Sequence, residues 1–482
     1  MSQLQNHIAG QWQLPAKALA VQLCDASTAE PLFAQMESSP EQIENAIAVA
    51  SDTHRRGVWT GLPAEQRALL LERVAAELSL RGEALAVTDS QSTGVIKSLT
   101  SRFALICAAA FKGAAQLVRQ PPAIEQFAGP HGNLLVERLP LGPAAIIAPW
   151  NAPAGITAHK LASALAAGCP CIIKPSEWAP LSGQIIMQAV EAAGLPVGVC
   201  QLLQGTGVTG AALTADSRIA AVSFTGGLAG GRAVAAACAQ DIKPAQLELG
   251  GNNPLVVLQD ANLDNAADNI LTAMITLNGQ WCRALGRLLI HEAIAEDLLG
   301  RVKARLAAVV MGDAQIASSQ MGPIVHPGHL AHIKEAVAAY QALGGELHQP
   351  TKLPQLDGWF YPPTLITGLD PSQTLDEIFG PVVTVHTFSD DDEAVEIANG
   401  APYGLAAYVF GEERHCWQVA RRIVTGITKI NAVTMLNLNP MAPRPAWNLS
   451  GIGEEGTLET FEFFRGTRVI GVAGPNSVES EQ

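Results

Sequence analysis

The feature that most constrains the fold is a repeated alternation of short apolar runs with longer helical segments. Glycine and proline groups such as Pro140-Leu-Gly-Pro143 and Gly250-Gly251 separate the blocks. We predict strands at 144–148, 169–173, 220–224, 254–258 and 287–291, and helices at 155–167, 181–193, 262–275 and 294–310. Parallel strands need a long crossover connection, which a helix supplies. The sequence therefore predicts two α/β units with parallel sheets, preceded by helices within residues 40–119.

The composition of the 482-residue chain narrows the class of protein. Hydrophobic residues make up 48% and charged residues 15%, a balance typical of a packed globular protein. The formal charge of −14, without a dense run of lysine and arginine, argues against nucleic acid or an anionic membrane as a partner, because phosphate affinity depends on clustered cations. The sequence shows neither a signal peptide nor an apolar window long enough to span a membrane. We therefore expect a cytoplasmic protein without a membrane partner.

The spacing of cysteine and histidine indicates no metal site. Eight cysteines without regular spacing suit reduced thiols better than a disulfide framework. His326, His329 and His332 are three residues apart, but no cysteine or carboxylate completes a standard ligand pattern around them. We expect no bound metal and interpret the three histidines as the solvated start of a helix.

Glu248 and Cys282 are the residues that most strongly indicate chemistry. A thiolate attacks a carbonyl carbon, and a partly buried carboxylate activates the water that later hydrolyses the thioester. Glycine and amide side chains surround both residues, in Leu247-Glu-Leu-Gly-Gly-Asn-Asn-Pro254 and Gly279-Gln-Trp-Cys-Arg283. Because most cysteines in such a chain are small buried hydrophobes, this context singles out Cys282 as the nucleophile.

Two glycine-rich stretches compete as the dinucleotide site. Gly205-Thr-Gly-Val-Thr-Gly210 matches the dinucleotide fingerprint, but the acidic residue that should follow about twenty positions later is missing. Phe224-Thr-Gly-Gly-Leu-Ala-Gly-Gly231 ends a strand and opens a helix whose free N–H groups can face a pyrophosphate. Lys174 and Glu177 follow another predicted strand, at the edge where α/β sheets bind ligands. A carboxylate at 177 accepts hydrogen bonds from ribose hydroxyls and repels a 2′-phosphate, which favours NAD over NADP.

Several short motifs resemble those of the NAD(P)-dependent aldehyde dehydrogenase superfamily. They are Pro149-Trp-Asn151, Lys174-Pro-Ser-Glu177, Phe224-Thr-Gly-Gly227, Glu377-Ile-Phe-Gly-Pro381 and the stretches around Glu248 and Cys282. The motifs stand in the order of the family, and the base and the nucleophile lie 34 residues apart. One such motif alone is a weak signal, but several in order are specific. The resemblance covers nearly the whole chain.

The resemblance implies an α/β protein with an aldehyde dehydrogenase-like fold. Its parts are a Rossmann-type cofactor domain, an α/β catalytic domain and a small β oligomerisation arm. The expected boundaries are 1–120 and 141–250 for the NAD-binding domain, 251–449 for the catalytic domain, and 121–140 with 460–482 for the arm. Residues 467–471 are expected to join a hairpin of the arm, and the arm pairs with a neighbouring subunit. We therefore expect a homodimer or a homotetramer.

The resemblance also assigns roles to residues. Cys282 attacks the aldehyde, the side-chain amide of Asn151 and the backbone N–H of Cys282 bind the oxyanion, and Glu248 activates the deacylating water. Lys160 and Glu455 match a pair that assists proton transfer, although a surface ion pair explains them equally well. The residues expected to bind NAD are Pro149, Trp150, Lys174, Ser176, Glu177, Gly207, Phe224, Thr225, Gly226, Gly227, Gly231, Leu249, Gly250, Glu377 and Phe379.

The match to the family breaks around the substrate. Arg444 stands where an aromatic residue commonly walls the substrate tunnel, Arg283 directly follows the nucleophile, and His159 replaces a common tunnel tryptophan. Two guanidinium groups near one thiol suit an aldehyde that carries a carboxylate, sulfonate or phosphate, and we expect them to lower the pKa of the cysteine. Trp281 and Trp447 favour instead an aromatic aldehyde.

Three functions are open on the sequence. The main hypothesis is hydrolytic, NAD-dependent oxidation of an aldehyde to the carboxylic acid, with a substrate that carries an anionic group or is a neutral aromatic or aliphatic aldehyde. The second is a CoA-acylating dehydrogenase, in which a thiol resolves the thioester; the presence of Glu248 argues against it. The third is a relative without catalysis, which the presence of Cys282, Glu248 and Asn151 argues against.

Overall fold

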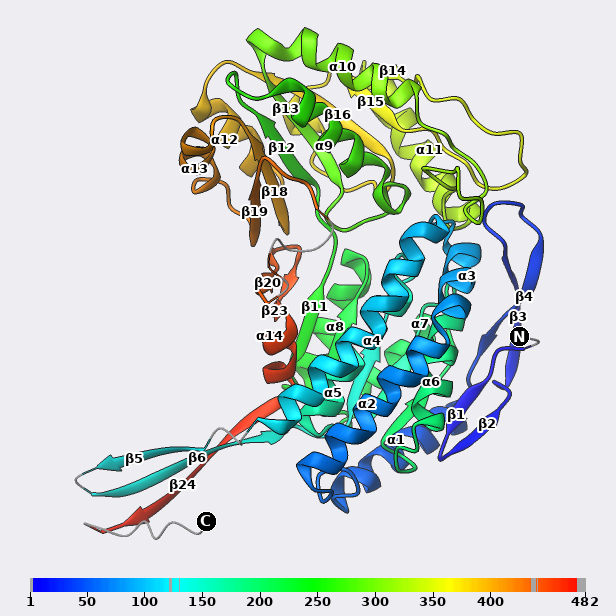
Figure 1. Ribbon diagram of the computed structural model, residues 1–482, viewed down its shortest axis with the longest axis vertical. Coiled ribbons are helices and arrows are strands. Elements are labelled where there is room, and N and C mark those ends of the chain that lie inside the picture. The colour runs from blue at the N-terminus through cyan, green and yellow to red at the C-terminus, as the bar shows by residue number, and fades with distance from the viewer. Residues whose placement is uncertain (1–2, 121–123, 130, 435–438, 440, 475–482) are drawn as a thin grey trace.

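The computed structural model describes residues 3–120, 124–129, 131–434, 439 and 441–474, and two α/β units fill most of it (Figure 1). The first unit is built on an eight-stranded sheet. In hydrogen-bonding order its strands are β2 (Gln11–Gln13), β1 (Asn6–Ile8), β9 (Cys200–Leu202), β8 (Cys171–Lys174), β7 (Ala144–Ile147), β10 (Ala221–Thr225), β11 (Ala245–Glu248) and β22 (Gly451–Ile452). The strands from β9 to β11 are parallel, whereas β1 and β22 flank them in the antiparallel sense.

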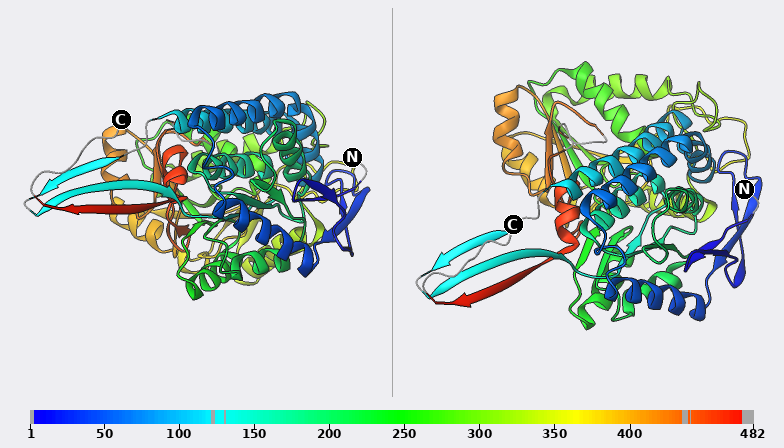
Figure 2. Two further views of the ribbon diagram at one scale, coloured as in Figure 1. Left: turned by 90° about the horizontal axis from the view of Figure 1, so that it is seen from below. Right: turned by 60° about the horizontal axis from the view of Figure 1, so that its bottom comes forward.

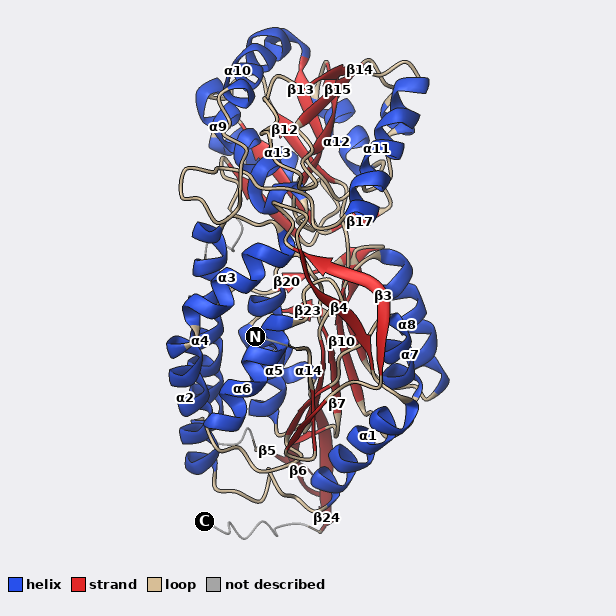
Figure 3. Ribbon diagram, turned by 90° about the vertical axis from the view of Figure 1, so that its right-hand side faces the viewer, coloured by secondary structure: helices blue, strands red, loops and turns tan. Residues whose placement is uncertain are grey.

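Helices cover both faces of the first sheet (Figure 3). On one face lie α2 (Ala64–Leu80), α3 (Gly82–Thr93), α4 (Lys97–Arg119), α5 (Pro153–Ala167) and α6 (Leu181–Ala192), and on the other α1 (Pro40–Arg55), α7 (Gly207–Ala215) and α8 (Leu228–Gln240). Side chains alternate between the two faces along β7. Ala144 and Ile146 belong to the core on the α5 face, and Ala145 and Ile147 to the core on the α1 face. A strand buried on both faces is apolar at every position, which explains the continuous apolar runs in the sequence.

The second unit contains a seven-stranded sheet. Its order is β14 (Glu346–His348), β15 (Thr364–Thr367), β16 (Val382–Phe388), β13 (Leu285–His291), β12 (Asn253–Val257), β18 (Ala406–Phe410) and β19 (Ile427–Ile430). All neighbouring pairs are parallel except β14 and β15. The helices of this unit are α9 (Leu263–Ile275), α10 (Ala295–Ala307), α11 (Pro327–Ala342), α12 (Asp391–Asn399) and α13 (Glu413–Ala420). The chain passes from β11 directly into β12 (Figure 1), and it later returns from β19 to β22 in the first sheet.

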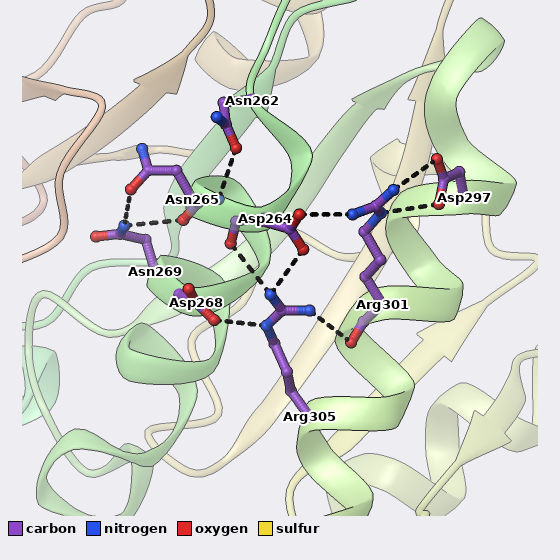
Figure 4. A network of polar contacts seen from close by, with 8 residues as sticks. All are labelled: Asn262, Asp264, Asn265, Asp268, Asn269, Asp297, Arg301 and Arg305. Carbon is purple, nitrogen blue, oxygen red and sulfur yellow. Dashed lines mark hydrogen bonds and ion pairs between the residues drawn. The ribbon is translucent and has the colours of Figure 1, made fainter.

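Helices α9 and α10 are joined on their outer side by a network of charged side chains (Figure 4). Arg301 contacts Asp264 at 2.8 Å and Asp297 at 2.9 Å, and Arg305 contacts Asp264 at 3.0 Å and Asp268 at 2.5 Å. The aspartates are exposed, so each pair contributes little to stability. The buried apolar face of the two helices therefore supplies most of the energy of their packing.

Three antiparallel strands extend from the body as an arm (Figures 1 and 2). They are β24 (Arg465–Ala473), β6 (Gly132–Pro140) and β5 (Glu125–Gly129), in that order. Residues 467–471 pair with β6 as predicted. Residue 460, expected to begin the arm, lies instead in α14 (Thr457–Phe463), which packs on α5, and the strand begins at Arg465. Exposed apolar side chains on the arm include Phe127, Leu134, Val469, Ile470 and Val472.

The predicted strands and helices of both units are confirmed, with ends displaced by at most three residues. The N-terminal strands were not predicted. Besides β1 and β2 they are β3 (Lys17–Cys24) and β4 (Pro31–Glu37), which form a hairpin of their own. Strand β3 is largely exposed. Its sequence therefore lacks the regular alternation of apolar and polar residues that predicts a strand.

Helix α4 is, within the described part of the chain, the one helix long and apolar enough to cross a membrane by length and composition. Its residues Cys107, Phe111 and Ala115 are buried in the core that α4 shares with α2 and α5. A core helix passes the same test, so the finding is weak evidence for a membrane span.

Candidate active site

A cavity of about 850 Å³ opens at the carboxyl edge of the first sheet. The final residues of four parallel strands line it, namely Ile147, Lys174, Thr225 and Glu248. The second unit contributes Cys282, Glu377 and Phe379 to the same lining. Open α/β sheets bind ligands at this edge, so the cavity lies where the sequence placed the cofactor. Of the fifteen predicted cofactor residues, all except Gly231 line it.

Side-chain amides hold the loop that carries Cys282. Asn253 Nδ2 donates to the carbonyl oxygens of Cys282 at 2.9 Å and Ala284 at 2.7 Å. Asn151 Nδ2 donates to the carbonyl oxygen of Gln280 at 3.0 Å. Among the described residues this is the one partner of the Asn151 amide nitrogen, so its second N–H remains for an oxyanion formed at Cys282. The predicted nucleophile and oxyanion donor are therefore brought together.

Burial dominates the charge states of the nucleophile and the base. It raises the pKa of Cys282 well above its usual range, and the charge of Glu248 and its hydrogen bond with the thiol raise the pKa further. Arg283 opposes the shift without outweighing it, so the expectation of a lowered cysteine pKa is wrong; desolvation of the thiolate is the larger effect. Burial likewise raises the pKa of Glu248, and the charge of Glu455 adds to it. Glu248 Oε1 is buried without a hydrogen-bond partner, which leaves it free to accept a proton.

The turn after β10 leaves a helix N-terminus open to the cavity. Helix α8 begins after Gly227, where no side chain caps the first turn. Phe224, Thr225, Gly226 and Gly227 line the cavity beside it. The backbone N–H groups of that turn therefore remain as donors for an anion. The serine of the family motif at 227 is glycine here, so only the backbone offers such donors at that position.

Gly231, predicted to contact the cofactor, lies beneath Leu249 instead. A Cβ atom at Gly231 would sit 2.4 Å from Leu249 Cδ2, closer than two carbon atoms can approach. Glycine at 231 thus lets α8 pack against the turn that follows β11. Leu249 itself lines the cavity, so Gly231 acts on the cofactor site only through that side chain.

Lys174 and Glu177 form the far end of the cavity. Lys174 is 4% exposed, and its Nζ lies 3.4 Å from Glu177 Oε2. Burial lowers the pKa of Lys174, while the charges of Glu177 and Glu37 oppose that change. Glu37, at the end of β4, also accepts a hydrogen bond from the Thr206 N–H at 2.9 Å, at the start of α7. No pattern in the sequence links Glu37 to this edge, because it reaches the site from a distant hairpin.

Glu377 and Phe379 form the end of the cavity near Cys282. Glu377 Oε1 accepts a hydrogen bond from the Gly251 N–H at 2.8 Å, and burial raises the pKa of Glu377 to about 8. A Cβ atom at Gly250 would lie 1.8 Å from Glu377 Oε2, so only glycine fits there. Phe379 has a φ of 57°, and its ring meets Trp150 edge-on at 5.4 Å. The cavity therefore has the carboxyl group of Glu377 and the aromatic rings of Phe379 and Trp150 in its lining.

Comparison with known proteins decides the family. Residues 12–470 match the aldehyde dehydrogenase family. The chain belongs to the aldehyde dehydrogenase family. It is 32% identical over 459 residues to a geranial dehydrogenase of Castellaniella defragrans, which covers 93% of this chain and 94% of that protein. It is 31% identical over 467 residues to a betaine aldehyde dehydrogenase of Bacillus subtilis, with 93% of each chain covered.

Solved structures confirm the aldehyde dehydrogenase fold. A betaine aldehyde dehydrogenase from Staphylococcus aureus, crystallised with NAD+, superposes with a TM-score of 0.93 at 28% identity and covers 99% of this chain and 96% of its own. An NAD-dependent aldehyde dehydrogenase from Sinorhizobium meliloti superposes with the same TM-score at 28% identity, covering 100% and 97%. The resemblance drawn from the motifs, and the fold it implied, are both confirmed.

Lys160 and Glu455 form a buried ion pair in this aldehyde dehydrogenase, which excludes the surface pair considered above. Lys160 Nζ lies 2.5 Å from Glu455 Oε1, and the Lys160 side chain is fully buried. Lys160 also donates to Ser223 Oγ at 2.8 Å, and Ser223 Oγ donates in turn to Gln246 Oε1 at 2.8 Å. Gln246 Nε2 donates to the Glu454 carbonyl at 2.7 Å. The sequence signal that could have revealed this network is Gln246, a polar residue inside the short strand that ends in Glu248.

The three histidines of α11 do start a helix, but only His332 is exposed, whereas His326 and His329 are partly buried. His326 is the N-cap residue of α11, and its ring stacks on Trp178 with centroids 3.8 Å apart. His329 and His332 line the cavity, and His329 Nε2 lies 2.8 Å from the Phe379 carbonyl oxygen. Burial lowers the pKa of His329 to about 4, so the ring is neutral and donates this hydrogen bond. In the described residues no group of three candidate ligands could hold a metal ion.

None of the five predicted substrate residues lines the cavity of 850 Å³. Trp281 is 5% exposed and packs in the core of the second unit, whereas Trp447 is 47% exposed in β21 (Trp447–Asn448), which pairs with β17 (Tyr403–Gly404). Arg444 and His159 contact each other at 3.1 Å and belong to the network of Glu455, and Arg283 is buried.

Proposed function

We propose that this aldehyde dehydrogenase oxidises an aldehyde to the carboxylic acid with NAD as its cofactor, through a thioester on Cys282. One observation carries the proposal. A single cavity is lined by Cys282, Glu248 and Asn151 and also by Lys174 and Glu177. A nucleophile, a base and an oxyanion donor thus meet a groove with polar groups at spaced positions, as a dinucleotide requires.

The residues of the cavity fit NAD. The uncapped N-terminus of α8 offers N–H groups to the pyrophosphate. Lys174, Ser176 and Glu177 bind the adenosine ribose, and the carboxylate at 177 disfavours a 2′-phosphate. Glu377 binds the nicotinamide ribose, with Phe379 beside the ring. The division into an NAD-binding domain of residues 1–120 and 141–250 and a catalytic domain of residues 251–449 belongs to this proposal.

The reaction begins with transfer of the Cys282 proton to Glu248, along their hydrogen bond. The thiolate attacks the carbonyl carbon, and the new oxyanion accepts hydrogen bonds from the Asn151 amide and the Cys282 N–H. When bound, NAD supplies the hydride acceptor that turns this adduct into the thioester. Burial raises the pKa of both Cys282 and Glu248, so both groups favour their neutral forms before the proton is transferred.

Glu248 then activates the water that hydrolyses the thioester. Its unpartnered Oε1 accepts the proton of the water, and the nearby Lys160 and Glu455 pair passes the proton onward. A CoA-acylating reaction depends less on such a base, because a thiol is far more acidic and more nucleophilic than water. The buried, raised-pKa carboxylate therefore favours water as the acceptor.

The test is NADH formation, followed by absorbance, with and without CoA. A panel of neutral and anionic aldehydes, tested with NAD and then NADP, is expected to give turnover without CoA and a preference for NAD. The Cys282→Ala variant is the matched control and should bind NAD without turnover. Absence of NADH formation with every aldehyde would refute the proposal, and strict dependence on CoA would favour the acylating alternative.

Substrate, assembly and location complete the proposal. The substrate carries an anionic group, because the buried Arg283 directly follows Cys282 and its charge acts on Glu248. The arm presents exposed strand edges and apolar side chains, which favours pairing with a second copy in a homodimer or homotetramer. All eight cysteines are free, which suits the reducing cytoplasm. Light scattering at two protein concentrations tests the assembly.

A further inference from the structure

Arg283 is a buried cation without a counter-ion. It is 7% exposed, and its Nε atom is buried without a hydrogen-bond partner. Within the described part of the chain, no carboxylate oxygen lies within 4.0 Å of its guanidinium group. Only its backbone is held, since the Tyr408 hydroxyl donates to the Arg283 carbonyl oxygen at 2.7 Å. A guanidinium group has five N–H donors, and leaving them unpaired inside a protein is strongly unfavourable.

Positive charge exceeds negative charge around this residue. Lys160, Arg283, Lys429 and Arg444 carry the positive charges, and Glu248 and Glu455 are the carboxylates that interact with Arg283. Lys429 lies close enough to Arg283 to have its own pKa lowered by it. Lys429 is directed to Thr434, where it donates to the carbonyl oxygen at 2.5 Å. Among the described residues, these four cations outnumber the two carboxylates that interact with Arg283.

The two arginines near the nucleophile differ in their partners. Arg444 lies 3.7 Å from Glu455 Oε2 and donates to His159 Nε2 at 3.1 Å, so it has side-chain partners that Arg283 lacks. The other oxygen of Glu455 is occupied by Lys160. Glu455 therefore has no oxygen left to approach Arg283 as a full partner. Only Arg283 remains for an anion that comes from outside the chain.

We propose that Arg283 binds the carboxylate of an aldehyde acid, with Lys429 adding to the positive field, and that Arg444 lies outside this carboxylate site. The proposal rests on the proposed function and names its substrate class. Arg283 directly follows Cys282, so a carboxylate held there places the aldehyde of the same short molecule near the thiol. A planar guanidinium group matches a carboxylate in two parallel hydrogen bonds, which gives it geometric selectivity.

The test compares carboxylated and neutral aldehydes of similar size. The pairs are succinate semialdehyde with pentanal, and para-carboxybenzaldehyde with para-methylbenzaldehyde. The ratio of kcat/KM within each pair is measured for the wild type, Arg283→Met and Arg444→Met. We expect the wild type to prefer the carboxylated member, and Arg283→Met to lower its kcat/KM by about 30-fold or more, the effect of truncating one partner of a buried charge pair. The neutral member should fall by a clearly smaller factor, because it makes no charge contact with Arg283 and loses only the effect of that charge on the pKa of Cys282.

Arg444→Met serves as the comparison, since it disturbs the network of Glu455. Arg444→Met should lower kcat/KM for both aldehydes of a pair by similar factors. The ratio of the two kcat/KM values should therefore stay unchanged. Thermal unfolding and NAD binding by fluorescence check that Arg283→Met is folded; removing an unpaired buried charge should not lower the melting temperature.

The other outcomes overturn the proposal. An equal loss for both members in Arg283→Met would mean that Arg283 stabilises the thiolate or oxyanion and does not bind substrate. A wild type that oxidises neutral aldehydes without preferring the carboxylated ones would refute the carboxylate site while leaving the proposed function intact. A wild type that forms no NADH with any aldehyde would refute both.

Discussion

Replacing Lys160 with methionine isolates the contribution of the buried ion pair to the fold. Lys160 has no exposed side-chain surface and lies 2.5 Å from Glu455 Oε1. Methionine keeps most of the volume and removes the charge. Glu455 then keeps only Arg444, at 3.7 Å, as a close cation. A buried carboxylate that loses its main partner is strongly destabilising.

The magnitude follows from the pKa of Glu455. Burial acts to raise this pKa, but the charges of Lys160, Arg444 and His159 together lower it from 4.5 to about 2. At about 1.4 kcal/mol per unit, that shift corresponds to about 3 kcal/mol of stabilisation. Lys160 provides the largest favourable share, so Lys160→Met should lower the free energy of unfolding by about 2 to 4 kcal/mol at pH 7. Because the pKa of Glu455 is depressed, this stabilisation is complete above about pH 4.5 and is lost as the pH falls towards 2.

The assay is denaturant unfolding of wild type and variant at matched protein concentration, at pH 7 and pH 4. Lys97→Met is the matched control, because Lys97 Nζ lies at the same 2.5 Å from Glu83 but both side chains are exposed, at 33% and 72%. In Lys97→Met the free energy of unfolding should fall by less than about 1 kcal/mol. The double variant Lys160→Met/Glu455→Gln should recover part of the loss. Equal losses in Lys160→Met and Lys97→Met would refute the reasoning.

Three further predictions concern catalysis. Glu248→Gln should still give a burst of NADH but slow steady turnover, because deacylation suffers more than hydride transfer; an equal loss of both in stopped-flow measurements would point to another base. Wild-type turnover should rise with pH across the raised pKa of Glu248, since the base must be deprotonated, and a flat pH–rate profile would contradict that role. Gly250→Ala should weaken NAD binding at least tenfold in fluorescence titration, because its Cβ would displace Glu377, while Gly227→Ala, with open space around its Cβ, should bind nearly as wild type.

Much of the fold could be predicted because it depends on local patterns. The strands that end at Ile147, Lys174 and Thr225 are apolar on both faces, and turns of glycine and proline bound them. The same strand ends place the motifs at one sheet edge, so most of the residues that line the cavity were predicted as well. Gly231 was the exception, since packing beneath Leu249 and contact with a ligand both demand glycine.

The sequence could not reveal contacts between distant segments. Glu37 reaches the start of α7 from an N-terminal hairpin with little periodicity, and His329 reaches the cavity because α11 packs beside Phe379. The two arginines could not be told apart either. Which guanidinium has a carboxylate partner depends on where Glu455 lies, and the pairing of β20 (Arg444–Pro445) with β23 (Glu454–Glu455) decides that.

Asn253 links the segment between the two sheets to the loop that carries Cys282. Glu248 ends the first sheet and Asn253 begins the second, so the base sits on one side of the joint and the amide on the other. The Asn253 side chain lies 3.2 Å from the Gly251 carbonyl oxygen while it also holds the Cys282 and Ala284 carbonyls, and the Ala406 N–H donates to its Oδ1. The nucleophile therefore belongs to the second unit and the base to the first, and the hydrogen bonds of Asn253 fix the Cys282 loop to the segment that joins them.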